Sequence, residues 1–344
     1  LALPPSAARK SVSGFQSLAR MVRRLRRSPP GRPQLSLVLI VYDMPEQAAN
    51  TIRSLLPGYQ REVSGSDYEL IVVENASAST LSPDFLQDLP ANVHYHLRQN
   101  PEPSPAQAIN YGASQARGDA VCIMIDGARM VTPGIVGNLL AAHRGFPAAV
   151  VSIPGYHLGR ELQQTAVGSG YDRDTERDLL ASIAWPGDGY RLFDIACFSG
   201  SCSPGFFLPN SESNCISVPL AVWHALGGFD PRFDLPGGGL INLDFYKRAC
   251  ELPEVQHVIV PGEGTFHQFH GGVTTGGVSQ EMRADYIERS RSQYRTLRGA
   301  DFSSPRTRPV YLGAIPVQAQ KFVHYSAARA LRSRGEAPLP ESTA

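Results

Sequence analysis

Acidic side chains that could contact a nucleotide or a metal ion stand at the ends of three apolar runs. Asp43, Glu74 and Asp126 each follow a run of strand length. An isolated acid at such a position is more often a helix cap, but three carboxylates at one sheet edge repel one another. Their joint placement therefore favours contacts to ribose or base groups together with a divalent metal ion.

Strands and helices alternate in the segments that must position these acids. Continuous apolar runs are typical of parallel strands buried on both faces. We predict strands at 35–42, 68–73, 93–97 and 120–125 and helices at 45–56 and 105–116. This alternation predicts an α/β fold with a doubly wound, mostly parallel sheet, flanking helices and a binding groove beyond the carboxyl ends of the strands. Neither GxGxxG nor GxxxxGK[ST] follows the first strand, which argues against dehydrogenases and P-loop enzymes.

Composition sets limits on the class of protein. The 344 residues are 42% hydrophobic and 18% charged, enough to form one large α/β domain or two smaller ones. No apolar run is long enough to cross a bilayer, and residues 1–13 do not resemble a secretory signal. Five scattered cysteines predict no disulfide framework, so we expect a cytoplasmic protein.

Basic residues are concentrated at the start of the chain. Residues 1–33 carry eight Lys or Arg and no acid, so the remainder has a net charge of 24 minus 31, or −7. Apolar residues recur at helical spacing among these arginines, which predicts either a helix lying on an anionic membrane surface or partner, or a solvated tail. A peripheral location at the inner face of the membrane is one outcome, and nucleic-acid binding is not expected because the rest of the chain is acidic.

Several motifs resemble those of a known family. The segment LSLVLIVYDMPEQAANTIRSLL looks like an opening strand, loop and first helix, and IVVENAS resembles a second-strand motif that usually reads VVDNAS or VVDDGS. NPEPSPAQAINYGASQARGDAVCIMIDGA resembles the stretch that runs through an Asn-x-Gly helix to an Asp-x-Asp motif. Together they resemble the family 2 glycosyltransferases of the GT-A fold, well over residues 35–150 and moderately over 205–275.

The resemblance implies a set of nucleotide-binding residues. Glu74 takes the position that contacts the nucleobase, and Asp126 is the first acid of the metal motif. Nucleotide contacts are implied for Tyr42, Asp43, Asn110 and Gly127 as well.

The metal motif departs from the family pattern. Ala128 replaces its second acid, which leaves the need for a divalent ion, Mn²⁺ or Mg²⁺, as a question. His267 and His270 are candidate replacements because imidazole binds such ions, and the resemblance includes enzymes that supply a late histidine. The alternative is a histidine pair that is hydrogen-bonded at a strand end. The Gly-rich stretch 271–277 is either a lid over the donor, with Arg283 adding charge, or an ordinary loop.

The general base implied by the family also departs from the pattern. Gly227-Gly228-Phe229-Asp230 is the usual lead-in, but the expected Glu-Asp pair falls on Ile241-Asn242. Asparagine cannot accept a proton, so we predict that Asp244, two residues later, acts as base. The alternatives are a different group, an acceptor that needs no strong base, or a first-turn acid favoured by the helix dipole.

Residues between the two halves are candidates for acceptor binding. Trp185 lies in an aromatic, Gly-rich loop, and Glu212 and Asn214 precede a strand-like run at 216–220. These loops suit a carbohydrate or peptide acceptor, or are core-facing turns. Cys197 and Cys202 have no second pair nearby and are interpreted as buried thiols.

Taken together, these features predict an inverting glycosyltransferase. Its donor would be a nucleotide-diphosphate sugar, most simply a UDP- or dTDP-sugar, and its acceptor a glycan, lipid-linked glycan or peptide. The alternatives are a catalytically impaired GT-A module that binds a sugar nucleotide or a partner, and a nucleotidyltransferase, for which the expected Gly- and Arg-rich loop is missing. The predicted organisation is a basic arm at 1–33, a GT-A domain at 34–300 with a nucleotide-binding half at 34–150 and an acceptor and catalytic half at 151–300, and a C-terminal extension at 301–344 that carries a helix over 317–332.

Overall fold

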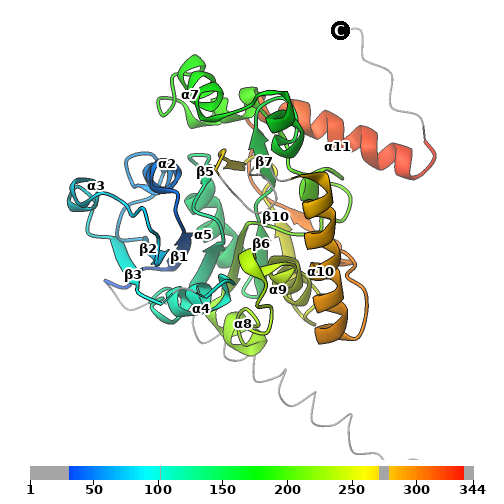
Figure 1. The fold of residues 1–344 in the computed structure, drawn as a ribbon, viewed down its shortest axis with the longest axis horizontal. Coiled ribbons are helices and arrows are strands. Elements are labelled where there is room, and N and C mark those ends of the chain that lie inside the picture. Colours follow the sequence, from blue (N-terminus) through cyan, green and yellow to red (C-terminus); the bar gives the residue numbers. More distant parts are fainter. Residues whose placement is uncertain (1–30, 101, 271–278, 337–344) are drawn as a thin grey trace, which may run out of the picture.

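The structure is a computed structural model that describes residues 31–100, 102–270 and 279–336. Its centre is an eight-stranded sheet of order β12-β10-β6-β9-β4-β1-β2-β3, and a four-stranded sheet of order β5-β11-β7-β8 lies beside it in these described parts (Figure 1). The strands are β1 Leu35–Val41, β2 Tyr68–Asn75, β3 Val93–Arg98, β4 Ala120–Met124, β5 Arg129–Val131, β6 Ala149–Ser152, β7 Gly155–Leu158, β8 Ala196–Phe198, β9 Cys215–Pro219, β10 Gln256–Ile259, β11 Thr265–His267 and β12 Val310–Tyr311.

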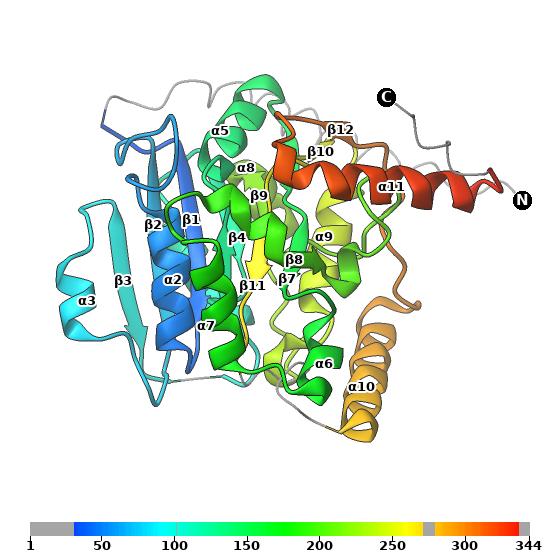
Figure 2. The same ribbon diagram turned by 90° about the horizontal axis from the view of Figure 1, so that it is seen from above.

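Helices surround both sheets (Figures 1 and 2). The α-helices are α2 Pro45–Leu55, α3 Pro83–Gln87, α4 Ala106–Ser114, α5 Ile135–Gly145, α6 Gln163–Ala166, α7 Arg173–Ser182, α8 Leu220–Leu226, α9 Ile241–Cys250, α10 Gln280–Arg298 and α11 Gln320–Ser333. The 3₁₀ helices are η1 Val167–Ser169, η2 Gly189–Ile195, η3 Gly200–Cys202, η4 Pro236–Gly238 and η5 Val317–Ala319. In the described parts of the chain, no helix is long and apolar enough to cross a bilayer.

The large sheet is mostly parallel. Among the described strands of the large sheet, only β9 is antiparallel to its neighbours, β4 and β6. The α/β fold class expected from the sequence is therefore confirmed, and the predicted strands at 35–42, 68–73, 93–97 and 120–125 are found as β1 to β4 with ends shifted by one or two residues. The small sheet was not predicted from the sequence.

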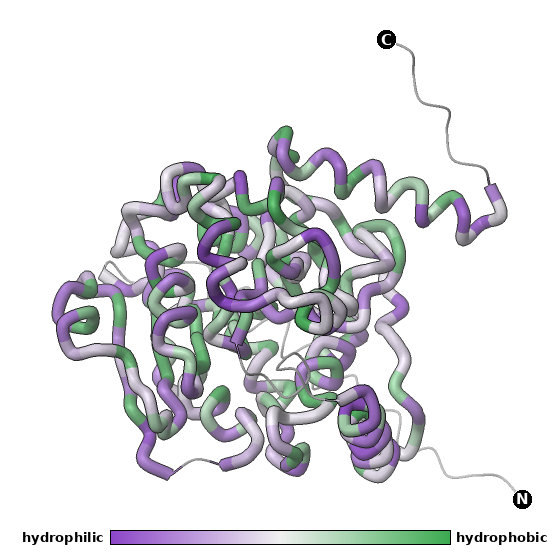
Figure 3. The backbone as a smooth tube through the Cα atoms, turned by 45° about the horizontal axis from the view of Figure 1, so that its top comes forward, coloured by the Kyte–Doolittle hydropathy of each residue, from purple (hydrophilic) through white to green (hydrophobic). Residues whose placement is uncertain are grey.

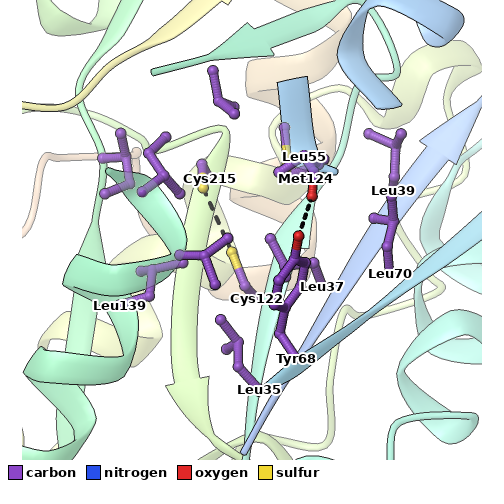
Figure 4. Packing of buried hydrophobic residues seen from close by; sticks show 14 of the residues in the cluster. Leu35, Leu37, Leu39, Leu55, Tyr68, Leu70, Cys122, Met124, Leu139 and Cys215 are labelled. Atoms are coloured by element: carbon purple, nitrogen blue, oxygen red, sulfur yellow. Dashed lines mark hydrogen bonds between the residues drawn. The ribbon is translucent and has the colours of Figure 1, made fainter. Parts of the chain in front are cut away.

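Apolar layers cover both faces of the large sheet, because side chains along each strand alternate between the faces. Leu35, Leu37 and Leu39 face α2 and α5 in one core, and Val38 and Ile40 face α4, α8 and α9 in the other. In the first core the hydroxyl of Tyr68 donates to the carbonyl of Leu55, and the free thiols of Cys122 and Cys215 lie 3.5 Å apart (Figure 4). Burial on both faces explains why these strands are uniformly apolar.

Residues beyond 300 are part of the folded body. Strand β12 pairs with β10 at the edge of the large sheet, and Phe322 of α11 packs its ring against Tyr156 with centroids 4.7 Å apart. Hydrophobic and hydrophilic residues alternate along α11, which extends away from the body (Figure 3). Part of the predicted C-terminal extension at 301–344 therefore packs on the two sheets.

A buried histidine in β10 makes stability depend on pH. His257 is only 5% exposed, and its ring contacts Ser152, Tyr246 and Thr307. Burial lowers its pKa from 6.5 to about 4, so below pH 6.5 the unfolded chain takes up a proton that the folded chain does not. The contribution of His257 to the free energy of unfolding is fully present above pH 6.5 and is lost as the pH falls towards 4. We expect a loss of about 2 kcal/mol between pH 8 and pH 5.

Urea unfolding of His257→Gln at both pH values checks this expectation. The difference between pH 8 and pH 5 should shrink by that amount relative to the unsubstituted protein. His324→Gln, which changes an exposed histidine of α11, should leave the difference unchanged. An unchanged difference in His257→Gln would contradict the assignment.

Candidate functional site

Three acidic residues meet at the carboxyl edge of the large sheet. Strands β4, β1 and β2 are parallel neighbours, so Asp126, Asp43 and Glu74 reach the same edge, as predicted. Glu74 is the penultimate residue of β2 and does not follow it. Ligands of open α/β sheets bind at this edge.

The small sheet brings two histidines to Asp126. His267 pairs in register with Arg129 of β5, three residues after Asp126. The Nε2 atom of His267 lies 3.1 Å from Asp126 Oδ2, and that of His270 lies 3.7 Å from Asp126 Oδ1. The two Nε2 atoms are 3.0 Å apart, and all three residues offer ligand atoms within 4.8 Å of one another. We call Asp126, His267 and His270 the Asp126 cluster.

Gln163 sets the tautomer of His267. Its Nε2 donates to the carbonyl of His267 at 2.9 Å, which leaves its Oε1 to accept from His267 Nδ1. The proton therefore sits on Nδ1, and the lone pair of Nε2 faces the Asp126 carboxylate. Burial lowers the pKa of His267 to about 4, so the ring is neutral near pH 7.

The Asp126 cluster fits a metal ion. A lone pair that faces a carboxylate is unfavourable unless a cation or proton lies between them, and two ligands at right angles around a metal are about 3 Å apart. Two imidazoles and one carboxylate suit Mn²⁺ better than Mg²⁺, which prefers oxygen ligands.

Ala128 could not have carried a ligand in this structure. Its side chain is fully buried in the apolar core with Val41 and Met44. Its backbone N–H donates to Asp126 Oδ1, and its carbonyl accepts from Gln268 N at 2.8 Å. The residue therefore orients Asp126 and the histidine strand through its backbone.

Arg129 was not singled out in the sequence, although it is part of the site. It is 8% exposed, and its Nε lies 3.4 Å from Asp126 Oδ2. Its Nε and Nη1 atoms are buried without a hydrogen-bond partner in the described parts of the chain. A guanidinium with unused donors is suited to bind phosphate. The signal in the sequence was an arginine within the otherwise apolar stretch 128–131.

Two more residues that support the cluster were missed. Gln163 is fully buried on α6, and Glu176 of α7 accepts from the backbone N–H of Phe269 at 2.7 Å. Burial raises the pKa of Glu176 to about 7. Both lie far from residue 267 in sequence, and their types alone give no indication of the contact.

The expected nucleotide contacts have different surroundings. Glu74 is fully buried, and its Oε2 accepts from Tyr95 and Leu81 while Oε1 has no partner among the described residues. Tyr42 is exposed, and Asp43 accepts from the backbone of Ser79.

Gly127 and Asn110 have packing roles that bear on their expected contacts. A Cβ atom on Gly127 would lie 2.9 Å from the carbonyl oxygen of Ile40, so only glycine fits there. The amide of Asn110 both donates to the carbonyl of Phe229 and accepts from its N–H. A contact of Asn110 with the nucleotide stays a prediction.

Asp244 does not fit a general base. It is fully buried, Arg298 donates to both of its carboxylate oxygens at 2.6 and 2.8 Å, and Arg248 donates to Oδ2 at 2.8 Å. Both of its oxygens are therefore occupied by guanidinium donors, and the side chain is not exposed to an acceptor substrate. The expectation from the sequence is therefore corrected, because Asp244 belongs to an ion-pair network that joins α9 to α10.

Three of the other expected catalytic and acceptor residues are in contact with one another. Asn242 Nδ2 donates to Glu212 Oε2 at 2.9 Å and to Asn214 Oδ1 at 3.2 Å. Trp185 is not with them: its Nε1 donates to the hydroxyl of Tyr59, which itself donates to Val131 at the end of β5 opposite to Arg129. Trp185 is therefore a packing residue of the small sheet. The stretch 271–277 lies outside the described residues, and Arg283 lies in the first turn of α10.

Comparison with protein families identifies the segment that holds much of this edge. Residues 36–191 match the model described as Glycosyl transferase family 2. The chain is thus similar to glycosyl transferase family 2 over residues 36–191, which we call the family 2 region. The family 2 region contains Asp43, Glu74 and Asp126, whereas Glu212, Asn242 and the two histidines lie beyond it. With this match, the GT-A-like fold class expected from the sequence is confirmed.

Solved structures resemble the chain at low sequence identity. S. aureus TarS 1–349 in complex with UDP-GlcNAc is 11% identical, with 88% of this chain and 73% of that chain covered and a TM-score of 0.49. A longer S. aureus TarS structure is 10% identical, with 76% and 44% covered and a TM-score of 0.47. The Pyrobaculum calidifontis mannosyltransferase PcManGT in complex with GDP-Man and Mn²⁺ is 13% identical, with 96% and 86% covered and a TM-score of 0.45. Comparison with curated proteins gives no significant match.

Proposed function

We propose that the chain is an inverting glycosyltransferase that uses Mn²⁺ and a UDP- or dTDP-sugar, most simply a hexose, as donor. The single observation that carries the proposal is the Asp126 cluster beside the guanidinium of Arg129, whose Nε and Nη1 have no hydrogen-bond partner among the described residues, at the carboxyl edge of a family 2 region. The acceptor is a hydroxyl group of a glycan, lipid-linked glycan or peptide.

The donor diphosphate would lie between Arg129 and the Asp126 cluster. The Nε and Nη1 atoms of Arg129, which donate no hydrogen bond among the described residues, would bind phosphate oxygens. A bound cation supplies the positive charge that stabilises the departing diphosphate. Gln163 holds His267 in the tautomer that a metal ligand needs.

Glu74 supports a pyrimidine nucleotide. Because Oε2 already accepts two hydrogen bonds, only Oε1 remains to accept from a nucleobase. Uracil and thymine each offer a single ring N–H, whereas guanine presents two adjacent donors that would need both oxygens. This count favours a UDP- or dTDP-sugar over a GDP-sugar.

Calorimetric titration with UDP, dTDP and GDP tests the proposal. The chain should bind UDP or dTDP at least tenfold more tightly with Mn²⁺ than with EDTA, because the cation offsets the repulsion between the diphosphate and Asp126. Mg²⁺ should be less effective than Mn²⁺, and GDP should bind more weakly. The proposal fails if none of the three nucleotides binds under any of these conditions.

Asn242 favours a second candidate, a GT-A module that binds the donor without transferring it. Position 242 holds an asparagine where the family resemblance implies an acid that acts as base. The two candidates differ in one measurement, the release of nucleoside diphosphate from a bound UDP- or dTDP-sugar. Binding with no release over hours would favour the second.

A further inference from the structure

A polar cluster of Glu212, Asn214 and Asn242 stands where the strand β9 begins and the helix α9 begins. Asn242 donates to Glu212 Oε2 at 2.9 Å and Asn214 donates to Glu212 Oε1 at 3.4 Å, so each carboxylate oxygen receives one hydrogen bond. Asn214 and Asn242 are 7% and 5% exposed, while Glu212 is only partly buried. Two buried amides thus fix a carboxylate that solvent or a substrate can still reach.

The reversed direction of β9 places this carboxylate at the edge of the sheet where Asp126 lies. Cys215 pairs with Met124, the last residue of β4, and Asp126 follows Met124 by two positions. The residues before Cys215 therefore continue past the end of β4. Ser213 donates to the carbonyl of Ile153, just after β6, which fixes the segment between the ends of these two strands.

Glu212 lacks the ion pairs that make Asp244 unsuitable as a general base. Among the described residues, no Lys, Arg or His forms an ion pair with Glu212, whereas Asp244 is held by Arg248 and Arg298. Each oxygen of Glu212 accepts one hydrogen bond, so a lone pair on each remains open to the hydroxyl group of an acceptor.

We propose that Glu212 is the general base of the transfer reaction and that Asn242 and Asn214 are its positioning residues. This inference rests on the proposed glycosyltransferase function. As the acceptor oxygen forms its bond to the anomeric carbon, the bond from that carbon to the phosphate oxygen breaks and its electron pair leaves with the diphosphate. The proton of the acceptor hydroxyl moves to Glu212, which balances the step.

The geometry also gives a reason for asparagine at position 242. An aspartate there would place two carboxylate oxygens about as close as the present 2.9 Å contact, where they would repel each other. Asparagine instead donates a hydrogen bond to the acid. In this proposal the base lies in the segment before β9, and it is hydrogen-bonded to the position in the first turn of α9 where the family resemblance implies the base.

Release of nucleoside diphosphate from UDP-glucose and UDP-N-acetylglucosamine, with Mn²⁺ and with water as acceptor, tests the inference. Glu212→Gln should lower the rate on the order of 10²- to 10⁴-fold, while UDP binding measured by calorimetry changes less than threefold. The double variant Glu212→Gln/Asn242→Asp puts the acid back on α9 and should recover at least tenfold of the lost rate. A purely structural role for Glu212 does not predict that recovery.

Glu254→Gln is the matched control. It makes the same chemical change at an exposed residue that precedes β10, at the opposite edge of the sheet, and should alter neither the rate nor UDP binding. The inference is overturned if Glu212→Gln keeps the rate within twofold of the unsubstituted protein. If the unsubstituted protein neither binds a nucleotide nor releases one, the proposed function itself fails and the assignment of Glu212 falls with it.

Discussion

Mn²⁺ binding is expected to weaken on the order of 100-fold when His267 is replaced by alanine. The Nε2 atom of His267 lies 3.1 Å from Asp126 Oδ2 and 3.0 Å from His270 Nε2, so it occupies the centre of the Asp126 cluster. Its loss leaves one carboxylate and one imidazole, too few protein ligands to compete well with water for the ion. Calorimetric titration of the chain with Mn²⁺ alone measures this effect without any substrate.

Gln163 offers a graded version of the same experiment. Gln163→Leu removes the acceptor that keeps the proton on His267 Nδ1, and should weaken Mn²⁺ binding about 10- to 100-fold although it removes no ligand. His324→Ala, an exposed histidine on α11, is the control and should have no effect. Equal Mn²⁺ affinity in His267→Ala and the unsubstituted protein would show that the histidines form a hydrogen-bonded pair at a strand end.

The large sheet could be predicted because its strands are buried on both faces and therefore continuously apolar. Leu35 to Val41 has no exposed side chain, so it has the pattern of a parallel strand without ambiguity. The strands of the small sheet are three or four residues long, and such short runs carry no periodicity. The reversed direction of β9 was equally hidden, because direction is a property of the pairing and does not follow from the residues of one strand.

The residues of the candidate site also fall into those that could be predicted from the sequence and those that could not. Asp126 and the two histidines could be proposed from residue type and from their place at strand ends. Gln163 could not, because its importance comes from its contact with His267, 104 residues away. Arg129 was marked only by its place in an apolar stretch, and its lack of a hydrogen-bond partner is visible only in the structure. Asp244 was assigned by its offset in a motif, and its contact with Arg298, 54 residues away, has no counterpart in local sequence.

That contact makes Asp244 the source of the second large effect. Asp244→Asn is expected to lower the free energy of unfolding by about 3 kcal/mol, because removing one partner leaves charged groups uncompensated in a buried network. Arg298 is 20% exposed and Arg248 27% exposed, and Arg298 keeps Asp230 at 2.9 Å, so the loss should stay below that of a fully buried pair. Guanidinium unfolding at neutral pH measures it.

The same variant separates a structural acid from a catalytic one. At a temperature where Asp244→Asn remains folded, its release of nucleoside diphosphate should stay within a few-fold of the unsubstituted protein, whereas Glu212→Gln should lose rate and keep its stability. Asp285→Asn, which changes a 71% exposed acid on the helix that carries Arg298, is the control and should shift the free energy of unfolding by less than about 0.5 kcal/mol. If Asp244→Asn released nucleoside diphosphate at least 100-fold more slowly with unchanged stability, Asp244 on α9 would be the base. The opposite result, a slow and stable Glu212→Gln beside an active and destabilised Asp244→Asn, places the base on Glu212, because Asp244 has ion pairs whose loss destabilises the fold and Glu212 has none among the described residues.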